Sequence, residues 1–415
     1  MSIQTPSPLS RSLSPKRELW LLLTLAGIQF THILDFMIMM PLGPQFTRIF
    51  SITDAQFGML VSAYTLAAGA SGLLAATYLD KLGRKKLLLV LYVCFGLATL
   101  ACGLAPTYYT LMVARVLAGV FGGVLSALSQ TIIADVIPYE RRGRAMGIVM
   151  TSFSVSTVAG VPLGLFLAAH FSWHAPFFGI AALVGLLAAG AYITLPPLAD
   201  HLKLKNRPSA WQGIEQVLAD ANHLKAFAFS GLLMFAGFTV IPFITIYLQT
   251  NVGWRTDQVP YVYLCGGLVT LLTARLIGVL TDRKGKVVMF RLMAVLVIIP
   301  MVATTLTEGW PMWAVLVVST AFFASMSGRM IPGMAIITAA ANPQLRGTFM
   351  ALNSAVQSAA MGIAAFIGGL IISRDAQNLV QHYWMAALVG SSASVAAIFI
   401  VGRLKLYQTN MPAAQ

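Results

Sequence analysis

The sequence has little charge for its length. Only 10% of its 415 residues are charged, whereas an average soluble domain has about 25%. At the same time 58% of the residues are hydrophobic and the mean hydropathy is +0.80. A soluble fold of this size could not bury so much apolar surface, so lipid must surround most of the chain.

Cysteine and the motifs of catalysis are also scarce. The three cysteines (Cys94, Cys102 and Cys265) lie inside apolar runs, where they form no disulfide framework or metal-ligand pattern and are expected to pack as small hydrophobic residues. There is no Walker loop, HExxH, nucleotide fingerprint or Ser-His-Asp arrangement. We therefore predict no enzyme, cofactor or metal, and no ATP-driven export unless a separate chain supplies the nucleotide domain.

What the sequence does have is twelve long apolar runs, each of the length that crosses a bilayer. They lie at 19–46, 55–79, 86–105, 108–134, 143–169, 174–195, 224–249, 258–281, 288–306, 311–340, 347–373 and 380–402. We predict an all-α membrane protein with twelve transmembrane helices in two pseudo-symmetric six-helix bundles.

The positive charges lie mostly on one side of these runs. With the spans numbered in order, 21 of the 27 basic residues fall in loops on the side of the termini; Arg48, Arg255 and Arg374 fall on the other side, and Arg115, Arg275 and Arg329 lie within spans. Basic loops stay in the cytoplasm. We expect an integral protein of the bacterial inner (plasma) membrane with both termini cytoplasmic. The net charge of +14 then reflects topology and not nucleic-acid binding.

Domain boundaries follow from the same pattern. We predict a cytoplasmic N-terminal tail at 1–18 (disordered to about residue 14, and no cleaved signal peptide), a first bundle at 19–195, a cytoplasmic linker at 196–222, a second bundle at 223–404 and a cytoplasmic tail at 405–415. The linker contains a weakly amphipathic piece from Trp211 to Leu218, which is expected to form a short helix on the membrane surface. Either a plain connector or a regulatory element fits this linker.

The two predicted bundles repeat each other. DKLGRKK at 80–86 returns about two hundred residues later as DRKGK at 282–286, and RGRAM at 142–146 returns as RGTFM at 346–350. Two unrelated patterns with nearly one period indicate a duplicated unit. Duplicated membrane halves with matched loops are typical of transporters whose halves rock around a central site.

The repeated loop resembles a motif of a known family. ATYLDKLGRK at 76–85 and GVLTDRKGK at 278–286 resemble the loop between helices 2 and 3 of the major facilitator superfamily, although Ala76 and Lys81 depart from its pattern. The resemblance implies a cytoplasmic gating latch, in which a carboxylate beside a glycine turn caps a neighbouring helix. We assign this latch to Asp80, Gly83, Arg84, Asp282, Arg283, Gly285, Asp135 and Arg142. The alternative is a basic turn that serves topology alone.

Two further motifs resemble those of the same family, and the motif in helix 5, together with helix 1, makes the chain similar to the twelve-helix drug:proton antiporters, near the arabinose-efflux-permease-like branch. RVLAGVFGG at 115–123 resembles the family's second motif, an arginine followed by closely spaced glycines, which let helices approach. GVPLG at 160–164 partly resembles the antiporter motif of helix 5. From Gly160, Pro162 and Gly164 we predict a bend in that helix, with plain packing as the alternative.

A lone carboxylate lies within the first span. Asp35 has no lysine or arginine nearby in sequence, and a carboxylate in a bilayer needs water or a partner. Helix geometry places it at a depth similar to that of Arg115. We predict a proton-coupling site of Asp35 with Arg115, or of Asp35 with His32 one turn away. A salt bridge that never titrates remains the alternative.

The resemblance also implies a central substrate cavity lined by helices 1, 4 and 10, among others. We place Gln29, Phe36, Arg329, Phe235 and Phe238 in it. Inward-facing aromatic side chains would favour apolar or aromatic substrates, and Arg329 could attract an anionic group or answer Asp35.

Together these features predict a monomeric secondary transporter. Its partners are a small-molecule substrate, protons and membrane lipid, and its activity is proton-coupled efflux of a small, apolar or amphipathic compound by alternating access. Export of a metabolite such as a sugar, nucleoside, amino acid or lysolipid is the alternative, and a channel or a non-transporting receptor fits the duplicated loops less well.

Overall fold

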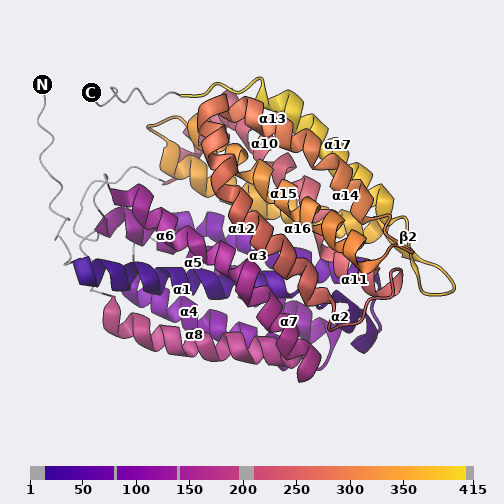
Figure 1. The fold of residues 1–415 in the computed structure, drawn as a ribbon. Coiled ribbons are helices and arrows are strands. Elements are labelled where there is room, and N and C mark those ends of the chain that lie inside the picture. The colour runs from indigo at the N-terminus through magenta and orange to yellow at the C-terminus, as the bar shows by residue number, and fades with distance from the viewer. Residues whose placement is uncertain (1–14, 79–81, 138–140, 196–209, 408–415) are drawn as a thin grey trace, which may run out of the picture. The chain divides into compact units, whose positions relative to one another are not determined.

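The computed structural model describes residues 15–78, 82–137, 141–195 and 210–407, which are almost entirely helical (Figure 1). The chain divides into two units. The first comprises Met1–Thr53 and Ala63–Arg207, and the second comprises Asp54–Ser62 and Pro208–Gln415. The third helix, α3, is therefore shared between them.

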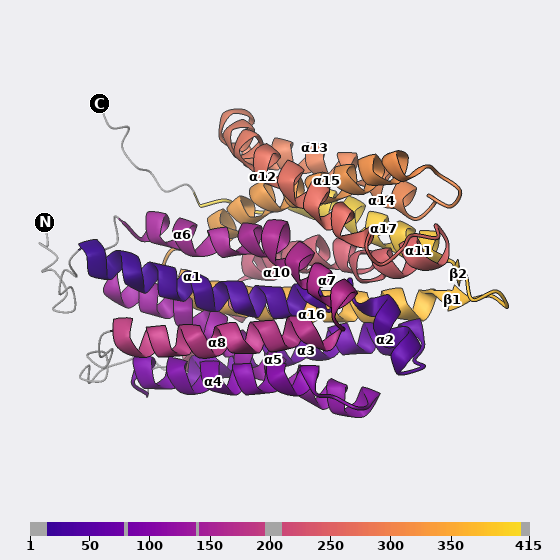
Figure 2. The ribbon, with the colours of Figure 1, turned by 60° about the horizontal axis from the view of Figure 1, so that its bottom comes forward.

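The first unit is a bundle in which helices distant in sequence pack together. Its helices are α1 (Pro15–Ile38), α2 (Gly43–Ile49), α3 (Asp54–Tyr78) from Ala63 onward, α4 (Arg84–Gly103), α5 (Tyr108–Val136), α6 (Arg142–Val155), α7 (Val161–His170) and α8 (His174–Thr194). Helix α4 packs on α5 and α8, and α1 packs on α6 and α8 (Figure 2).

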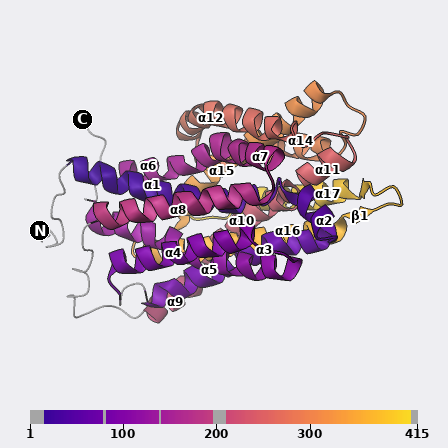
Figure 3. The same ribbon diagram turned by 90° about the horizontal axis from the view of Figure 1, so that it is seen from below.

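The second unit follows a similar plan. It contains α9 (Ala210–Ala219), α10 (Ala221–Phe238), α11 (Ile244–Thr250), α12 (Val259–Lys284), α13 (Lys286–Leu296), α14 (Ile298–Thr304), α15 (Met312–Ala340), α16 (Arg346–Ile371), β1 (Ser373–Arg374), β2 (Val380–Gln381) and α17 (Tyr383–Val401). Helix α15 packs on α12, α13 and α14 (Figure 2), whereas α10 packs on α16 and α17 (Figure 3).

Twelve helical segments of the described residues are long and apolar enough to cross a membrane, which confirms the predicted number. Many of their apolar side chains remain exposed, among them Leu97, Leu272 and Ile299. Helices that are apolar on all sides face lipid on one side and protein on the other. The protein is thus an integral membrane protein, and the all-α expectation holds except for one short hairpin among the described residues.

Two predicted spans are wrong at their ends. The first does not continue from 19 to 46, because α1 ends at Ile38 and residues 39–42 form turns before α2 begins at Gly43. Pro41 and Pro44 lack the amide hydrogen that a continuing helix needs, and Pro44 instead occupies the first turn of α2.

The last predicted span, 380–402, begins too early. Val380 pairs with Arg374 and Gln381 with Ser373 in an antiparallel hairpin, and α17 starts only at Tyr383. The carboxylate of Asp375 accepts hydrogen bonds from the backbone amides of Gln377 and Leu379, at 3.0 and 2.8 Å. A carboxylate that bonds to the next turn of its own chain favours a tight loop over a helix.

The end of the second unit is fastened by the side chain of Asn222. Its amide nitrogen donates to the carbonyls of Ala340 and Lys405, at 3.0 Å each, and its oxygen accepts from the amide of Lys405 at 2.8 Å. The amide of Tyr407 also donates to the carbonyl of Ala339. The first residues of the predicted tail, 405–407, are therefore bonded to the second bundle. In the predicted linker, residues 210–219 form the expected helix α9, and residues 196–209 lie outside the described part.

Candidate functional site

The strongest candidate site lies within the first unit, where four helices meet around one ion pair. Helix α1 carries Asp35 and His32, which are three residues apart and so lie on one face of the helix. Helix α5 carries Arg115, eight residues into its length, and α3 carries Tyr64 in the part that belongs to this unit. Helix α4 closes the site with Thr99 and Cys102.

Asp35 and Arg115 form a salt bridge. The NH1 nitrogen of Arg115 lies 2.8 Å from Oδ2 of Asp35 and also donates to the Asp35 backbone carbonyl at 3.3 Å. Both side chains have an exposed fraction of 0%. The pair predicted from helix depth is confirmed, and both of its side chains are fully buried.

Aromatic and incompletely bonded groups surround the pair. The guanidinium of Arg115 stacks over the ring of Tyr64, 4.3 Å from its centroid, a favourable cation–π geometry. The Thr99 hydroxyl and the Cys102 thiol also lie near the pair. By hydrogen-bond geometry, Oδ1 of Asp35 and two of the Arg115 nitrogens have no partner among the described residues. A buried ion pair with free hydrogen-bonding capacity is costly to keep, which makes it a candidate for function over stability.

His32 is a neighbour of the pair and not a member of it. Its ring lies 6.1 Å from that of Tyr64 and 6.2 Å from that of Phe95. Its Nδ1 is buried and has no partner among the described residues. Of the two pairings that the sequence left open for Asp35, the structure forms the one with Arg115.

The glycines that follow Arg115 let α3 approach α5. A Cβ added to Gly119 would overlap the carbonyl of Tyr64, and one added to Gly123 would overlap the carbonyl of Ala68. This confirms the close helix approach expected from the glycine spacing. The contact has a consequence for the site, because it places the Tyr64 ring over Arg115.

The predicted cavity residues occupy different settings. In the first unit, Gln29 donates to the Ser126 hydroxyl at 3.3 Å, and the half-buried Phe36 stacks on Tyr64 at a centroid distance of 5.4 Å. In the second unit, Phe235 and Phe238 of α10 are half-buried. Whether these side chains line a common cavity stays a prediction.

Arg329 is fully packed within the second unit. Its NH1 donates to the hydroxyl of Ser394 on α17 at 2.8 Å, and its NH2 donates to the carbonyl of Leu233 on α10 at 2.9 Å. Only 1% of its surface is exposed. This arginine therefore joins three helices of its own unit, and no carboxylate bonds to it among the described residues.

The two copies of the predicted latch loop differ. Asp80 lies outside the described residues, and so do the side chains of Asp135 and Arg142. Gly83 precedes α4 with an ordinary φ of −62°, and Arg84 behind it is buried. These residues keep the latch role only as a prediction.

The second copy contains a sharper turn. Gly285 has a φ of +92°, in the left-handed region that favours glycine, and it separates α12 from α13. Asp282 and Arg283 are exposed in the last turn of α12. Among the described residues of this unit neither side chain forms a cap at a helix start, and their part in a latch stays a prediction.

An ion pair that the sequence did not predict lies in the first unit. Arg141 donates to Glu18 at 2.8 Å, which joins the starts of α6 and α1.

The predicted bend in the fifth span coincides with a change of helix type. Residues Ser156–Gly160 form a π turn between α6 and α7. The hydroxyl of Ser156 donates to the Phe30 carbonyl of α1 at 3.2 Å. A Cβ atom on Gly160 would meet Leu34 of α1, and one on Gly164 would meet Ile38 of α1. The π turn supplies the irregularity at which a span bends, while the bend itself stays a prediction.

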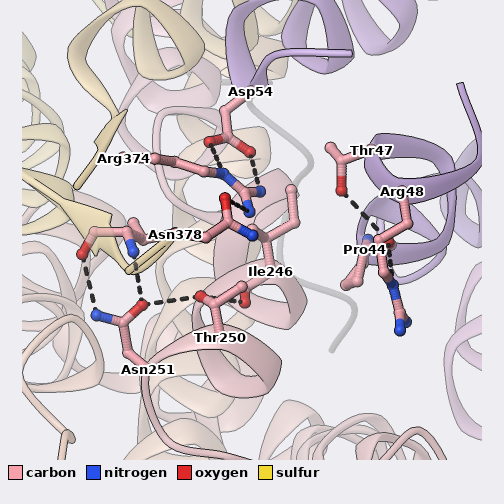
Figure 4. A network of polar contacts seen from close by, with 10 residues as sticks. Pro44, Thr47, Arg48, Asp54, Ile246, Thr250, Asn251, Arg374 and Asn378 are labelled. Atoms are coloured by element: carbon pink, nitrogen blue, oxygen red, sulfur yellow. Dashed lines mark hydrogen bonds and ion pairs between the residues drawn. The ribbon is translucent and has the colours of Figure 1, made fainter. Parts of the chain in front are cut away.

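A second ion pair that the sequence did not predict lies in the second unit, where it joins the start of α3 to the hairpin of β1 and β2. Arg374 of β1 holds the carboxylate of Asp54 at the start of α3 with two hydrogen bonds of 2.8 Å each (Figure 4). The two residues are 320 positions apart in sequence, and no local pattern connects them.

Twelve candidate spans among the described residues, in two helical units with a buried ion pair in the first, define a polytopic membrane protein. The sequence comparisons assign it further. The Major Facilitator Superfamily model matches residues 25–365 and 226–410, and the chain belongs to this superfamily. It is a membrane transporter of the superfamily's type.

Relatives and solved structures agree with this assignment. An uncharacterized MFS-type transporter, YtbD of Bacillus subtilis (strain 168), is 24% identical to this chain over 355 residues. The aligned region spans 85% of this chain and 86% of YtbD. Multidrug resistance protein 2 of the same organism is 26% identical over 199 residues, 48% of each chain. The crystal structure of a D-xylose-proton symporter matches with a TM-score of 0.75 and 17% identity, covering 94% of this chain and 98% of that one. At this identity the match supports the fold.

Proposed function

We propose that the protein is a proton-coupled exporter of a small apolar or amphipathic compound, working by alternating access as a monomer in the bacterial inner membrane with both termini cytoplasmic. The observation that carries the proposal is the dry Asp35–Arg115 pair. The Asp35 carboxylate is buried and only some of its hydrogen bonds are formed. A change in its protonation therefore changes the free energy of the ion pair strongly, as a proton-coupling site requires.

The ion pair supplies the coupling as follows. With Asp35 ionised, Arg115 holds it at 2.8 Å and the site is closed to water. With Asp35 protonated, the charge attraction is lost and the guanidinium retains the backbone carbonyl of Asp35 and the ring of Tyr64. Protonation from the acidic outer side and release inside would alternate these two arrangements, and substrate would occupy the cavity in the opposite phase.

The other charged and titratable groups near Asp35 belong to all four helices of the site. They are Arg115 of α5, His32 of α1, Tyr64 of α3 and Cys102 of α4. Arg115 is the group in direct contact with the carboxylate. We assign the coupling role to Asp35, the arginine counter-charge to Arg115, and a supporting role to His32.

The substrate class rests on the half-buried aromatic side chains Phe36, Phe235 and Phe238 and on the similarity to a multidrug resistance protein. Aromatic walls favour apolar ligands. Export of a metabolite such as a sugar is the second candidate, because the same fold also occurs in a D-xylose-proton symporter. A thermal-shift panel of both ligand classes on the purified protein would separate the two.

The coupling role is tested by Asp35→Asn in proteoliposomes with an imposed pH gradient and ethidium as the probe. The amide mimics the protonated acid, so we expect gradient-driven transport to fall to background while downhill exchange persists. Arg115→Ala should impair both. Asp257→Asn, which removes an exposed carboxylate paired with Arg255, is the matched control. Wild-type gradient-driven rates in Asp35→Asn would remove Asp35 from the mechanism.

A further inference from the structure

A cavity of about 820 Å³ lies within the second unit. Its walls come from the turn that joins α12 to α13, the last part of α15, the first residue of α16 and the residues that follow α17. Apolar side chains, among them Met334, Ala335 and Leu406, cover much of these walls. The volume is within the range of cavities that bind small molecules.

Two basic side chains line this cavity. Lys286 is the first residue of α13, and Arg346 is the first residue of α16. Nε of Arg346 is buried without a hydrogen-bond partner, and among the described residues neither cation has a carboxylate partner. No described residue that lines the cavity is acidic. A cavity with apolar walls and uncompensated positive charge fits an amphipathic anion.

Hydrogen bonds order the backbone of two of these walls. Before Arg346, the amide of Asn342 donates to Nε2 of the buried His223 at 3.0 Å. After α17, the amide of Tyr407 donates to the carbonyl of Ala339 at 2.7 Å, and both residues line the cavity. The charged and apolar groups of the cavity are therefore carried on bonded backbone, which lowers the entropy that a ligand must remove on binding.

Further basic residues lie in the two segments that supply these walls. Segment 281–291 contains four basic residues and one acidic residue, and segment 402–407 contains Arg403 and Lys405 and no acidic residue. The ammonium group of Lys405 lies 5.5 Å from the ring centroid of Tyr407, which lines the cavity. Clusters of basic residues at the end of a span attract anionic lipid headgroups, and basic pockets between spans bind them.

An apolar stripe begins at the cavity and follows α13. Val288 lines the cavity and is exposed, and Leu292 and Val295 are exposed further along the helix, with Ile299 beyond them in α14. Steps of four, three and four residues keep these side chains on one helix face. From Val288 to Ile299 the rise is roughly 16 Å, about half of a hydrocarbon core that is about 30 Å thick. An acyl chain can cover this stripe, whereas a soluble phosphate cannot.

We propose that this cavity binds the phosphate headgroup of an anionic phospholipid, with Lys286 and Arg346 on the phosphate and one acyl chain along the α13 stripe. Arginine binds phosphate oxygens through parallel N–H groups, and lysine binds them as a point charge. The stripe favours a lipid over a free phosphate compound, and the uncompensated cations favour an anionic lipid over a zwitterionic one. The site lies within one unit and takes no part in proton coupling.

The test measures the first bound lipid by native mass spectrometry of the full chain in detergent micelles. Phosphatidylglycerol and phosphatidylcholine with the same acyl chains are titrated separately. Each basic residue near a headgroup contributes about fivefold to the affinity for an anionic lipid. We therefore expect the wild-type protein to bind phosphatidylglycerol about twenty-five-fold more tightly than phosphatidylcholine. Lys286→Gln with Arg346→Gln should bring phosphatidylglycerol to the level of phosphatidylcholine.

Lys284→Gln with Arg403→Gln is the matched control, because it removes the same charge from two exposed residues that do not line the cavity. It should bind phosphatidylglycerol within about threefold of the wild type, and so should Lys286→Arg with Arg346→Lys, which keeps both charges.

Three results would overturn the proposal. The first is equal affinity of the wild-type protein for the two lipids. The second is equal weakening in the charge-removal variant and the control, which would mean that the surface charge attracts lipid without a site. The third is displacement of phosphatidylglycerol by an equal concentration of glycerol 3-phosphate, which would assign the cavity to a soluble phosphate compound. The assay measures binding without a pH gradient, so its failure is distinct from a failure of Asp35 coupling.

Discussion

Arg115 and Arg329 are both buried arginines on the fourth span of their half, yet their surroundings differ. Arg115 has a carboxylate at 2.8 Å, while Arg329 bonds one hydroxyl and one backbone carbonyl. Both lie on helices of 29 residues, but Arg115 is near the start of α5 and Arg329 is past the middle of α15. The two arginines therefore do not occupy equivalent positions of the repeat, and each joins the helices of its own unit in a different way. A balanced pair can change protonation, whereas a lone cation acts as a fixed charge.

Removal of the arginine from the balanced pair should have the largest effect. Arg115→Met leaves the carboxylate of Asp35 buried and unpaired, and we expect a loss of about 3–5 kcal/mol in the free energy of unfolding. The double variant Asp35→Asn with Arg115→Met should recover most of it, since neither charge then remains. Denaturation in mixed micelles measures both. A double variant as unstable as Arg115→Met would mean that the arginine stabilises by packing and not by charge.

A smaller loss is expected from Gly123→Ala, which tests how the α3 contact supports the first arginine. The new methyl group would overlap the carbonyl of Ala68 and push α3 away, at a cost of about 1–3 kcal/mol. Gly185→Ala on α8 is the control, because a Cβ there meets no atom within 4 Å and alanine favours helix. Equal stability of the two variants would contradict the close crossing.

The smallest change is expected at the lone arginine. Arg329→Met removes a buried cation to which no carboxylate bonds among the described residues. The substitution therefore leaves no unpaired charge behind. We expect the free energy of unfolding to shift by about 1 kcal/mol or less in either direction, since apolar replacements of buried charges are often neutral or stabilising. The same micelle assay applies. A loss as large as that of Arg115→Met would erase the distinction between the two arginines.

The sequence predicted the first ion pair because helix rise converts residue number into depth. Asp35 and Arg115 each lie on a regular helix whose start could be located, so their levels could be compared. The same reasoning fails for Asp54 and Arg374. Arg374 lies in a hairpin that the apolar pattern assigned to the edges of two spans, and periodicity gives no position for a loop.

The two latch loops have similar sequences but different backbone conformations. The glycine of each latch loop occupies the same place in the repeat, yet Gly83 has φ −62° and Gly285 has φ +92°. A glycine permits both values, so the residue alone does not select one. The difference lies in the neighbours, because Gly285 stands directly between the last turn of α12 and the start of α13, and its positive φ separates the two helices.

The π turn at Ser156–Gly160 makes the fifth span tolerant of a one-residue change in length at this point. A π turn holds one residue more than an α turn, so it accommodates a single-residue insertion in an otherwise regular helix. Deleting one of these five residues should therefore restore α geometry and leave the segments on either side in nearly the same register, with Gly164 still facing Ile38 of α1. A deletion elsewhere in this span would instead turn the rest of it by about 100° relative to α1. A homologue one residue shorter at the π turn can thus pack its fifth helix in the same register.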